Sequence, residues 1–298
     1  MYSRYLHGVV RRFSERRQSF GTFFLRNRPE LQLICRLLEQ KSSGSEANIA
    51  VLACSKGAEV YSIVWAIRSE RPDLKLRLHA LDISEEILNF AAGGVYSLAE
   101  VEAGTPKNGE CVASSAAVNW NTSRDQIAPM FERMTPLELK SMFDVEGSEA
   151  IVKPWLKEGI HWQRGDAGDQ QLISSLGPQD IVVANRFLCH MQPSAAEKCL
   201  RNIAHLVKPG GYLFVSGIDL DVRTKVALDM GWKPVTELIR EIHDGDASIR
   251  CGWPLEYWGL EPFDDRRPDW QTRYACVFQI GEAPCKTEEA ANLESAVG

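Results

Sequence analysis

Glu59 and Asp82 are two acidic residues in a stretch whose pattern predicts a strand, a turn, a helix and a second strand. The apolar run over residues 49–54 is short and bounded by turn residues, which is typical of a buried strand. Apolar residues then recur at helical spacing over 60–69, and residues 76–81 form a strand that leads into Asp82. The unit has the size of a βαβ crossover, whose ligand binds beyond the carboxyl ends of the strands. Both carboxylates are therefore candidates for holding a ligand.

The chemistry of these residues distinguishes between adenosine cofactors. Asp82 can accept hydrogen bonds from both hydroxyls of a ribose, and Gly57 lets the backbone of the turn approach a ligand closely. A dinucleotide site has a G-x-G-x-x-G turn that admits a pyrophosphate, but this turn has only Gly57. Glu59 would repel a pyrophosphate, whereas it can accept hydrogen bonds from an α-ammonium group. The turn therefore favours S-adenosylmethionine over NAD, and an ordinary turn with a solvated Glu is the alternative.

The same stretch resembles the CheR-type chemotaxis-receptor glutamate methyltransferases, a class I S-adenosylmethionine-dependent family. Residues 53–63 (ACSKGAEVYSI) are similar to the family's A-x-S-x-G-x-E-x-Y-S-I cofactor loop. Residues 22–26 resemble its T-x-F-F-R motif, whose Arg lies over the cofactor, residues 80–84 its ribose-binding A-S-D-I-D, and residues 94–96 its G-I-Y. The resemblance implies a set of cofactor-binding residues: Thr22, Arg26, Ala53, Ser55, Gly57, Glu59, Asp82 and Ile83.

The chain departs from the family pattern in two places. Only 21 residues precede Thr22, too few for the helical receptor-recognition domain that the family usually has. Residues 180–184 align with a family strand that ends in C-R-N, but Asn185 and Arg186 follow here in the reversed order. The resemblance therefore supports the methyltransferase core better than it supports a receptor as substrate.

Three polar residues that follow the strand over 180–184 are candidates for the part of the site where the methyl group is transferred. Asn185 and Arg186 end the strand over 180–184, beside the expected position of the cofactor methyl group, and Asn185 is assigned to the cofactor. Arg186 can bind a substrate carboxylate in bidentate fashion. His190 is the candidate base, because histidine is the side chain whose unperturbed pKa lies nearest neutrality. A structural histidine is the alternative.

A further cofactor contact is expected after the strand over 160–164. Asp166 and Ala167 follow this strand, where class I methyltransferases commonly hold the adenine amino group. An Asp that only caps a turn is the alternative. The family has an Asn at the matching place.

The rest of the chain predicts an α/β fold of the class I methyltransferase (Rossmann-like) type: a mostly parallel seven-stranded sheet with helices on both faces and a final antiparallel strand. A Thr cap, a Pro and a Glu open a helix at residue 135. The remaining expected elements are a helix over 85–92, a helix over 195–207, a K-P-G-G turn, strands over 212–216, 231–235 and 273–280, and a helix over 218–230.

The chain is expected to form one domain over residues 37–281, preceded by a basic helical segment over 1–36 that covers the cofactor. That segment holds eight Arg against two Glu, so a transit peptide or a patch for an anionic partner is the alternative. Residues 97–130 are rich in small and polar residues and form a lid-like insertion or a disordered one. The aromatic segment over 251–270 either floors a pocket or caps the sheet, and residues 282–298 form a flexible tail.

Composition limits the other classes of function. At 298 residues with 44% hydrophobic content the chain can bury one large core, and no apolar run reaches membrane-spanning length. Eight Cys without a C-x-x-C pair predict free thiols in a reducing cytoplasm and no metal site. A net charge of −6 argues against nucleic acid as a partner. The oligomeric state stays open.

These observations predict in-line methyl transfer to a small metabolite or short peptide, with a carboxylate as one candidate acceptor group. The preference for a compact acceptor rests on the short N-terminal segment and on Trp253, Tyr257 and Trp258, which could line a concave site. A CheR-like protein-glutamate O-methyltransferase is one alternative. A catalytically inactive module that binds S-adenosylmethionine is the other.

Overall fold

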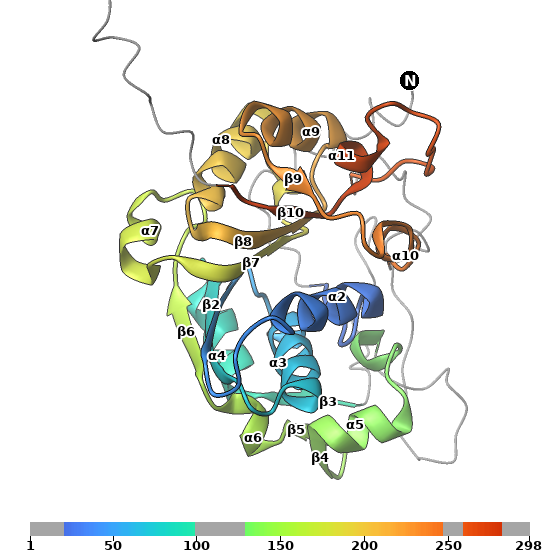
Figure 1. Cartoon of the computed structure of the whole chain (residues 1–298). Coiled ribbons are helices and arrows are strands. Elements are labelled where there is room, and N and C mark those ends of the chain that lie inside the picture. Colours follow the sequence, from blue (N-terminus) through green and yellow to red (C-terminus); the bar gives the residue numbers. More distant parts are fainter. Residues whose placement is uncertain (1–20, 99–128, 247–258, 282–298) are drawn as a thin grey trace, which may run out of the picture.

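A seven-stranded sheet forms the centre of the molecule in the computed structural model, which describes residues 21–98, 129–246 and 259–281 (Figure 1). Its strand order is β6-β2-β1-β7-β8-β10-β9. β10 runs antiparallel to both β8 and β9, whereas the pairs β1–β2, β1–β7, β2–β6 and β7–β8 are parallel. The predicted class I methyltransferase architecture is confirmed. The strands are β1 (Glu46–Leu52), β2 (Lys75–Asp82), β6 (Ile160–Arg164), β7 (Gln179–Asn185), β8 (Val207–Ser216), β9 (Lys233–Pro234) and β10 (Val277–Gln279).

Helices cover both faces of this sheet, because successive strand residues point to opposite sides. Ile49 and Val51 belong to the core on one face, and Ala50 and Leu52 to the core on the other. A strand that is apolar on both faces is typical of a buried parallel sheet. One face packs against α2 (Arg28–Leu38), α3 (Ala58–Glu70) and α4 (Glu85–Gly93), the other against α7 (Gln171–Leu176), α8 (Pro193–Ala204), α9 (Leu220–Asp229) and α11 (Trp270–Tyr274).

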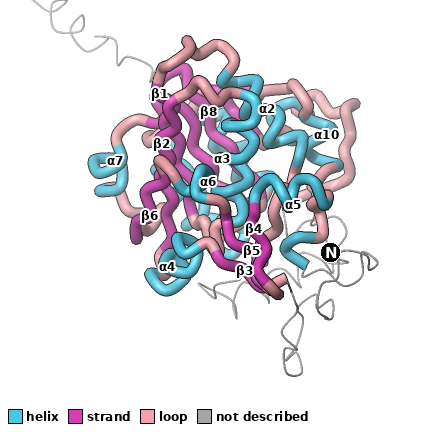
Figure 2. Tube along the Cα trace, turned by 90° about the horizontal axis from the view of Figure 1, so that it is seen from below, coloured by secondary structure: helices cyan, strands magenta, loops and turns pink. Residues whose placement is uncertain are grey.

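A second, small antiparallel sheet that the sequence analysis missed has the order β3-β5-β4. Figure 2 shows these three short strands side by side next to α5. Phe24 packs against Tyr96, Phe131 and Phe143 with ring centroids 5.1, 5.2 and 5.0 Å away, so this sheet anchors the chain just before Arg26. The elements here are β3 (Val95–Ser97), η2 (Pro129–Phe131), α5 (Pro136–Met142), β4 (Phe143–Glu146), β5 (Glu149–Val152) and α6 (Pro154–Lys157).

The predicted helix start at Thr135 is confirmed, whereas the last strand and the K-P-G-G residues differ from the prediction. The capping box at Thr135 is confirmed, with Glu138 as its partner at the start of α5. The last strand is shorter than predicted, because residues 270–274 form α11 and Arg273 and Tyr274 bind Glu261 from there. The K-P-G-G residues lie inside β8 rather than in a turn, since the Gly210 N–H donates to the carbonyl of Ile280 at 2.8 Å.

Several predicted segments lie wholly or partly outside the described residues. These are residues 1–20 of the basic segment, most of the predicted insertion (99–128), the tail (282–298), and residues 247–258, which include Trp253, Tyr257 and Trp258. The predicted boundary at residue 36 falls inside α2, which packs against α3. Within the described ranges, no helix has both the length and the apolar character needed to cross a bilayer.

Candidate active site

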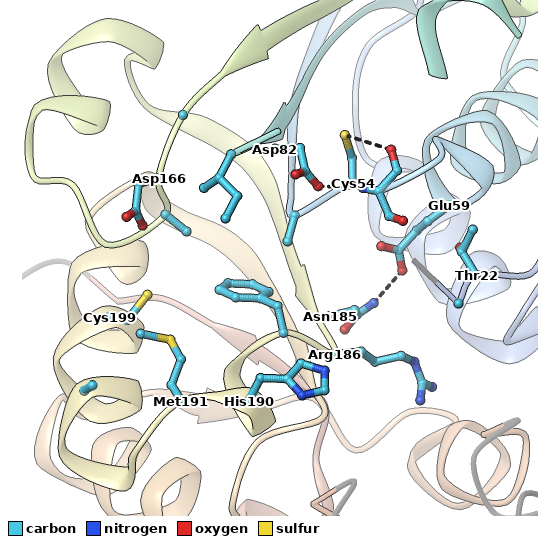
Figure 3. A pocket seen from close by; sticks show the side chains of 18 of the residues that line it. Thr22, Cys54, Glu59, Asp82, Asp166, Asn185, Arg186, His190, Met191 and Cys199 are labelled. Carbon is cyan, nitrogen blue, oxygen red and sulfur yellow. Dashed lines mark hydrogen bonds between the residues drawn. The ribbon is translucent and has the colours of Figure 1, made fainter. Parts of the chain in front are cut away.

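A cavity of about 280 Å³ lies at the carboxyl ends of β1, β2, β6 and β7. The chain leaves β1 toward one side of the sheet and reaches β7 on the other, which is the switch point where open α/β sheets bind ligands. The cavity brings together the predicted site residues except Gly57 (Figure 3). They are Thr22, Arg26, Ala53, Ser55, Glu59, Asp82, Ile83, Asp166, Ala167, Asn185, Arg186 and His190.

The end of the cavity beside Asp82, here called the β2 end, has a carboxylate fixed by backbone groups. Asp82 accepts hydrogen bonds from the N–H of Ser55 at 2.9 Å and from that of Ser84 at 3.0 Å. Ile83 is 44% exposed beside it and offers an apolar surface. Asp166 lines the same end, and its Oδ1 also accepts from the N–H of Gly168 at 2.8 Å. Asp166 thus caps a turn, as the alternative interpretation held, while it also lines the cavity.

Gly57 does not line the cavity but shapes the turn that precedes α3. It is the N-cap of α3 with φ +81°, a conformation that favours glycine. A Cβ atom at this position would lie 3.0 Å from Ala91 Cβ and 3.0 Å from the Trp162 ring. Gly57 therefore lets α3 begin close to α4 and β6, and it is not part of the cavity wall.

The backbone of the cavity wall holds strained residues. Ala53, Ser55 and Arg186 have φ of 52°, 50° and 63°, a region that costs non-glycine residues free energy. Arg186 is held there because its N–H donates to the Ser216 carbonyl at 2.8 Å, and because Gly217 has no Cβ to meet it. Such strain clusters where loops are shaped for a ligand.

Thr22 and Arg26 reach the cavity because the chain between them is tied to the core. Phe24 lies in the aromatic cluster of the small sheet, and the Leu25 N–H donates to Ser62 Oγ on α3 at 2.9 Å. Both anchors are buried. The segment that resembles T-x-F-F-R is thereby placed over the carboxyl end of β1.

A group of charged residues forms the opposite end, here called the charged end. The Asn185 amide nitrogen donates to Glu30 Oε1 at 2.6 Å and to Glu59 Oε1 at 2.8 Å, while Ser216 Oγ donates to Asn185 Oδ1 at 2.8 Å. Burial raises the pKa of Glu59, and burial together with repulsion from Glu59 raises the pKa of Glu30 to about 7. Glu30 was not predicted, because it lies outside every motif.

Two guanidinium groups complete the charged end. Arg186 Nη2 lies 2.5 Å from Asp246 Oδ2, and both side chains are nearly buried. Arg26 lies over the Phe23 ring at 5.1 Å, and its Nε has no hydrogen-bond partner among the described residues. Burial and the nearby Arg186 lower the pKa of Arg26 to about 9, so it stays charged at neutral pH. Arg26 is therefore more open to a ligand than Arg186.

His190 lies in η3 (Leu188–His190) and faces the cavity close to Arg186 in Figure 3. Phe187 and Met191 on either side of η3 also line the cavity but were not predicted. On α8, Ala195 and Cys199 face it from one side of the helix, and their spacing of four residues was a signal that could have found them. The remaining unpredicted lining residues are Gly21, Cys54, Gly165 and Gln192.

Comparisons with known proteins identify the kind of domain that contains this cavity. A family model described as "CheR methyltransferase, SAM binding domain" matches residues 21–110, and one described as "Methyltransferase domain" matches residues 110–215. The chain carries a class I S-adenosylmethionine-dependent methyltransferase domain, which is similar to the CheR type over residues 21–110. S-adenosylmethionine is the cofactor of such a domain, as the sequence predicted.

Two chemotaxis methyltransferases are similar to this chain at low sequence identity. Chemotaxis protein methyltransferase 1 of Pseudomonas aeruginosa is 26% identical over 60% of this chain and 56% of its own length. Chemotaxis protein methyltransferase Cher2 of Pseudomonas putida is 25% identical over 59% of this chain and 55% of its own. The chain thus spans just over half the length of these relatives.

Among solved structures, the N-methyltransferase NodS from Bradyrhizobium japonicum WM9, in complex with S-adenosyl-L-homocysteine, is similar over 71% of this chain and 78% of its own. It shares 13% sequence identity, with a TM-score of 0.36. This likeness is too distant to decide the family.

The donor and acceptor groups of the cavity fit S-adenosylmethionine. Asp82 and Glu59 supply carboxylates for hydroxyl and ammonium groups. Ser55 Oγ, which is buried and has no partner among the described residues, supplies a donor. Ile83, Phe187 and Met191 supply apolar surface for a planar base.

Proposed function

We propose that the methyltransferase domain transfers the methyl group of S-adenosylmethionine to a carboxylate, forming a methyl ester. The cofactor supplies a methyl group on a sulfonium sulfur, an electrophile that an oxygen nucleophile can attack in line. The observation that carries the proposal is the Arg26 guanidinium, which lines the cavity with an Nε that has no partner among the described residues. A guanidinium in this setting is suited to bind a carboxylate.

The cofactor roles of the wall residues follow from their positions. Asp82 would accept from the ribose hydroxyls, because its carboxylate is fixed at the end of β2 and faces the cavity. Glu59, at the charged end, would accept from the ammonium group of the methionine moiety. Ile83, Asp166 and Ala167 would contact the adenine, since they continue the β2 end beyond Asp82.

The acceptor carboxylate is assigned to Arg26 before Arg186. The guanidinium of Arg186 is already paired with Asp246, so binding a second carboxylate there would require that pair to open. A carboxylate is ionised at neutral pH and needs orientation rather than proton removal. Correct orientation alone can lower a barrier by roughly 7 to 11 kcal/mol. The Arg26 guanidinium and the fixed backbone at Arg186 are suited to orienting the acceptor carboxylate.

A small metabolite or short peptide as acceptor remains our proposal for the molecule that carries the carboxylate. The aromatic residues on which that prediction depended, Trp253, Tyr257 and Trp258, lie outside the described residues. A protein glutamate is the second candidate, favoured by the family model and by the names of the two chemotaxis relatives.

The test incubates the protein and methyl-labelled S-adenosylmethionine with a cell extract, which is then split into low-mass and macromolecular fractions. We expect base-labile label in the low-mass fraction, because methyl esters hydrolyse in base. Arg26→Ala should abolish this label while S-adenosylhomocysteine still binds. Arg36→Ala is the matched control, since Arg36 pairs with Glu237 on the surface, and it should change nothing.

The other outcomes separate the candidates. Base-labile label on a large protein alone would favour the protein-glutamate candidate. Base-stable label would contradict a carboxylate acceptor. No label in any fraction, with S-adenosylhomocysteine still bound, would favour an inactive binding module.

A further inference from the structure

The turn between β1 and α3, here called the cavity turn (residues 53–57), carries part of the cavity wall in a strained conformation. Ala53 and Ser55 line the cavity with φ of 52° and 50°, a region that non-glycine residues keep only where surrounding contacts hold them. On one side, Asp82 at the end of β2 accepts a hydrogen bond from the Ser55 N–H at 2.9 Å. One side of the cavity turn is therefore held by the strand next to β1.

A buried tyrosine of the small sheet holds the other side of the cavity turn. The Tyr96 hydroxyl donates to the carbonyl of Lys56 at 2.6 Å, across 40 positions of the chain. Only 1% of Tyr96 is exposed, and burial raises the pKa of its hydroxyl well above the usual range, so the hydroxyl keeps its proton for this bond. Because Lys56 directly follows Ser55, the hydrogen bond acts on the strained part of the turn.

Backbone pairing and ring contacts fix the position of Tyr96. α4 ends at Gly94 with φ +63°, which turns the chain into β3, and Tyr96 is paired there with Ala150 of β5. The Tyr96 ring packs edge-on against Phe90 and Phe24, with centroids 5.5 and 5.1 Å away. Tyr96 is therefore held by the core independently of the turn that its hydroxyl contacts.

The ring of Tyr96 also supports a second part of the cavity wall. Phe24, which it contacts, lies between Thr22 and Arg26, and both of these residues line the cavity. Tyr96 thus contacts this N-terminal segment with its ring and the cavity turn with its hydroxyl. Two parts of the wall that are distant in the sequence depend on one side chain outside the wall.

We propose that Tyr96 is a positioning residue for the cofactor, because its hydroxyl holds the cavity turn in the conformation that receives S-adenosylmethionine. Tyr96 does not line the cavity, so it acts through the turn. Without the hydroxyl, the turn spends part of its time in other conformations, and the apparent affinity falls with the fraction that can bind. The inference goes beyond the proposed function, since it depends on the cofactor and not on the methyl acceptor.

The experiment compares two variants of the full chain that each remove one buried hydroxyl and keep the ring. Tyr96→Phe removes the donor to Lys56, whereas Tyr61→Phe removes a donor to the Ala91 carbonyl at 2.7 Å, outside the cavity wall. Tyr61 is as deeply buried as Tyr96. In calorimetry, Tyr96→Phe should bind S-adenosylhomocysteine roughly threefold to tenfold more weakly than the wild type, and Tyr61→Phe should stay within about twofold.

Amide hydrogen exchange of the ligand-free protein separates this local role from a general loss of stability. The Cys54 N–H donates to the Leu81 carbonyl at 2.8 Å, and the Ser55 N–H donates to Asp82. In Tyr96→Phe, both amides should exchange faster relative to the buried amides of β7, because the cavity turn opens locally. In Tyr61→Phe, this relative rate should not change, whatever free energy of unfolding the variant loses.

Distinct results would overturn the role of Tyr96 and the proposed function. Unchanged affinity in Tyr96→Phe, equal losses of affinity in the two variants, or an unchanged relative exchange rate in Tyr96→Phe would each show that its hydroxyl does not position the turn. A wild type that does not bind S-adenosylhomocysteine would overturn the cofactor site and this inference with it. Failure of carboxylate methylation would overturn the proposed function alone, because neither measurement includes a methyl acceptor.

Discussion

The β2 end and the charged end of the cavity are built in different ways. At the β2 end, Asp82 is held by backbone N–H groups two and 27 residues away in the chain. At the charged end, side chains bind one another across 155 residues between Glu30 and Asn185, and across 60 between Arg186 and Asp246. The β2 end therefore depends on two neighbouring loops, whereas the charged end depends on the completed fold.

Because the two ends are held by different kinds of contact, they should respond differently to substitution. Backbone N–H groups fix Asp82 without neutralising its charge, which leaves a strong acceptor for neutral hydroxyls. The charged end instead balances buried carboxylates against buried guanidiniums, so removing any one charge disturbs the others. We expect changes at the β2 end to alter ligand affinity, and changes at the charged end to alter stability, ligand discrimination and pH dependence as well.

The largest effect is expected from Asp246→Ala. It leaves the nearly buried Arg186 guanidinium without this carboxylate, which should lower the free energy of unfolding by about 3 to 5 kcal/mol. Denaturant unfolding measures the change. Asp264→Ala, at the exposed pair with Arg266, is the control and should leave the midpoint almost unchanged. Equal midpoints for the two variants would contradict the contrast between the ends.

Asp82→Ala is expected to weaken ligand binding without discrimination between ligands. It removes two charge-assisted hydrogen bonds to ribose, each worth roughly 1.5 to 3 kcal/mol, so affinity should fall by at least about tenfold. In calorimetry, the loss should be the same for S-adenosylhomocysteine and for 5′-methylthioadenosine, which has the same adenosine and thioether but no ammonium group. Asp169→Ala serves as the control, because this Asp caps a turn outside the cavity wall. An unchanged affinity would place the ribose elsewhere.

Glu59→Gln should sharpen the contrast between the two ends of the cavity. It should lower the affinity for S-adenosylhomocysteine but not that for 5′-methylthioadenosine. The change replaces the charged acceptor for the ammonium group by a neutral amide oxygen, and affinity for S-adenosylhomocysteine should fall by roughly tenfold. Affinity for 5′-methylthioadenosine should stay within about twofold, since that ligand has no ammonium group. Equal losses for both ligands would mean that Glu59 shapes the cavity rather than binding the ammonium.

The smallest effect is expected from His190→Ala. A carboxylate acceptor needs no proton removed, so kcat should fall by less than about threefold once the acceptor is known. A loss of about 10² to 10⁴ in kcat would mean that His190 acts as a base and that the acceptor is a hydroxyl, phenol or amine. Measuring kcat and KM separately distinguishes this from weaker substrate binding.

The same difference explains how much the sequence could predict. Asp82, Ser55 and Glu59 lie in one continuous strand–helix–strand unit, so local pattern and a family resemblance located them together. Glu30 and Asp246 belong to no motif, and only the packing of α2 and of the segment after α10 (Ile239–Asp244) brings them to Arg186 and Asn185. The pairing of Arg186 could not be predicted for the same reason.

The large seven-stranded sheet was predicted better than the small three-stranded sheet. The order and direction of the large sheet follow from alternating strands and helices, which leave few right-handed topologies. The β4–β5 hairpin was missed, although Gly147 with φ +60° provides its turn, because its strands are only four residues long. Its place could be recognised only from the aromatic cluster around Phe24, whose members are scattered along the chain.

The most direct test of the account is a crystal structure of the protein with S-adenosylhomocysteine bound. We predict that the ribose hydroxyls lie within hydrogen-bonding distance of the Asp82 carboxylate and that the ammonium group lies beside Glu59, with the sulfur directed toward Arg26. A ligand bound in the reverse direction, or outside this cavity, would contradict the assignment of both ends.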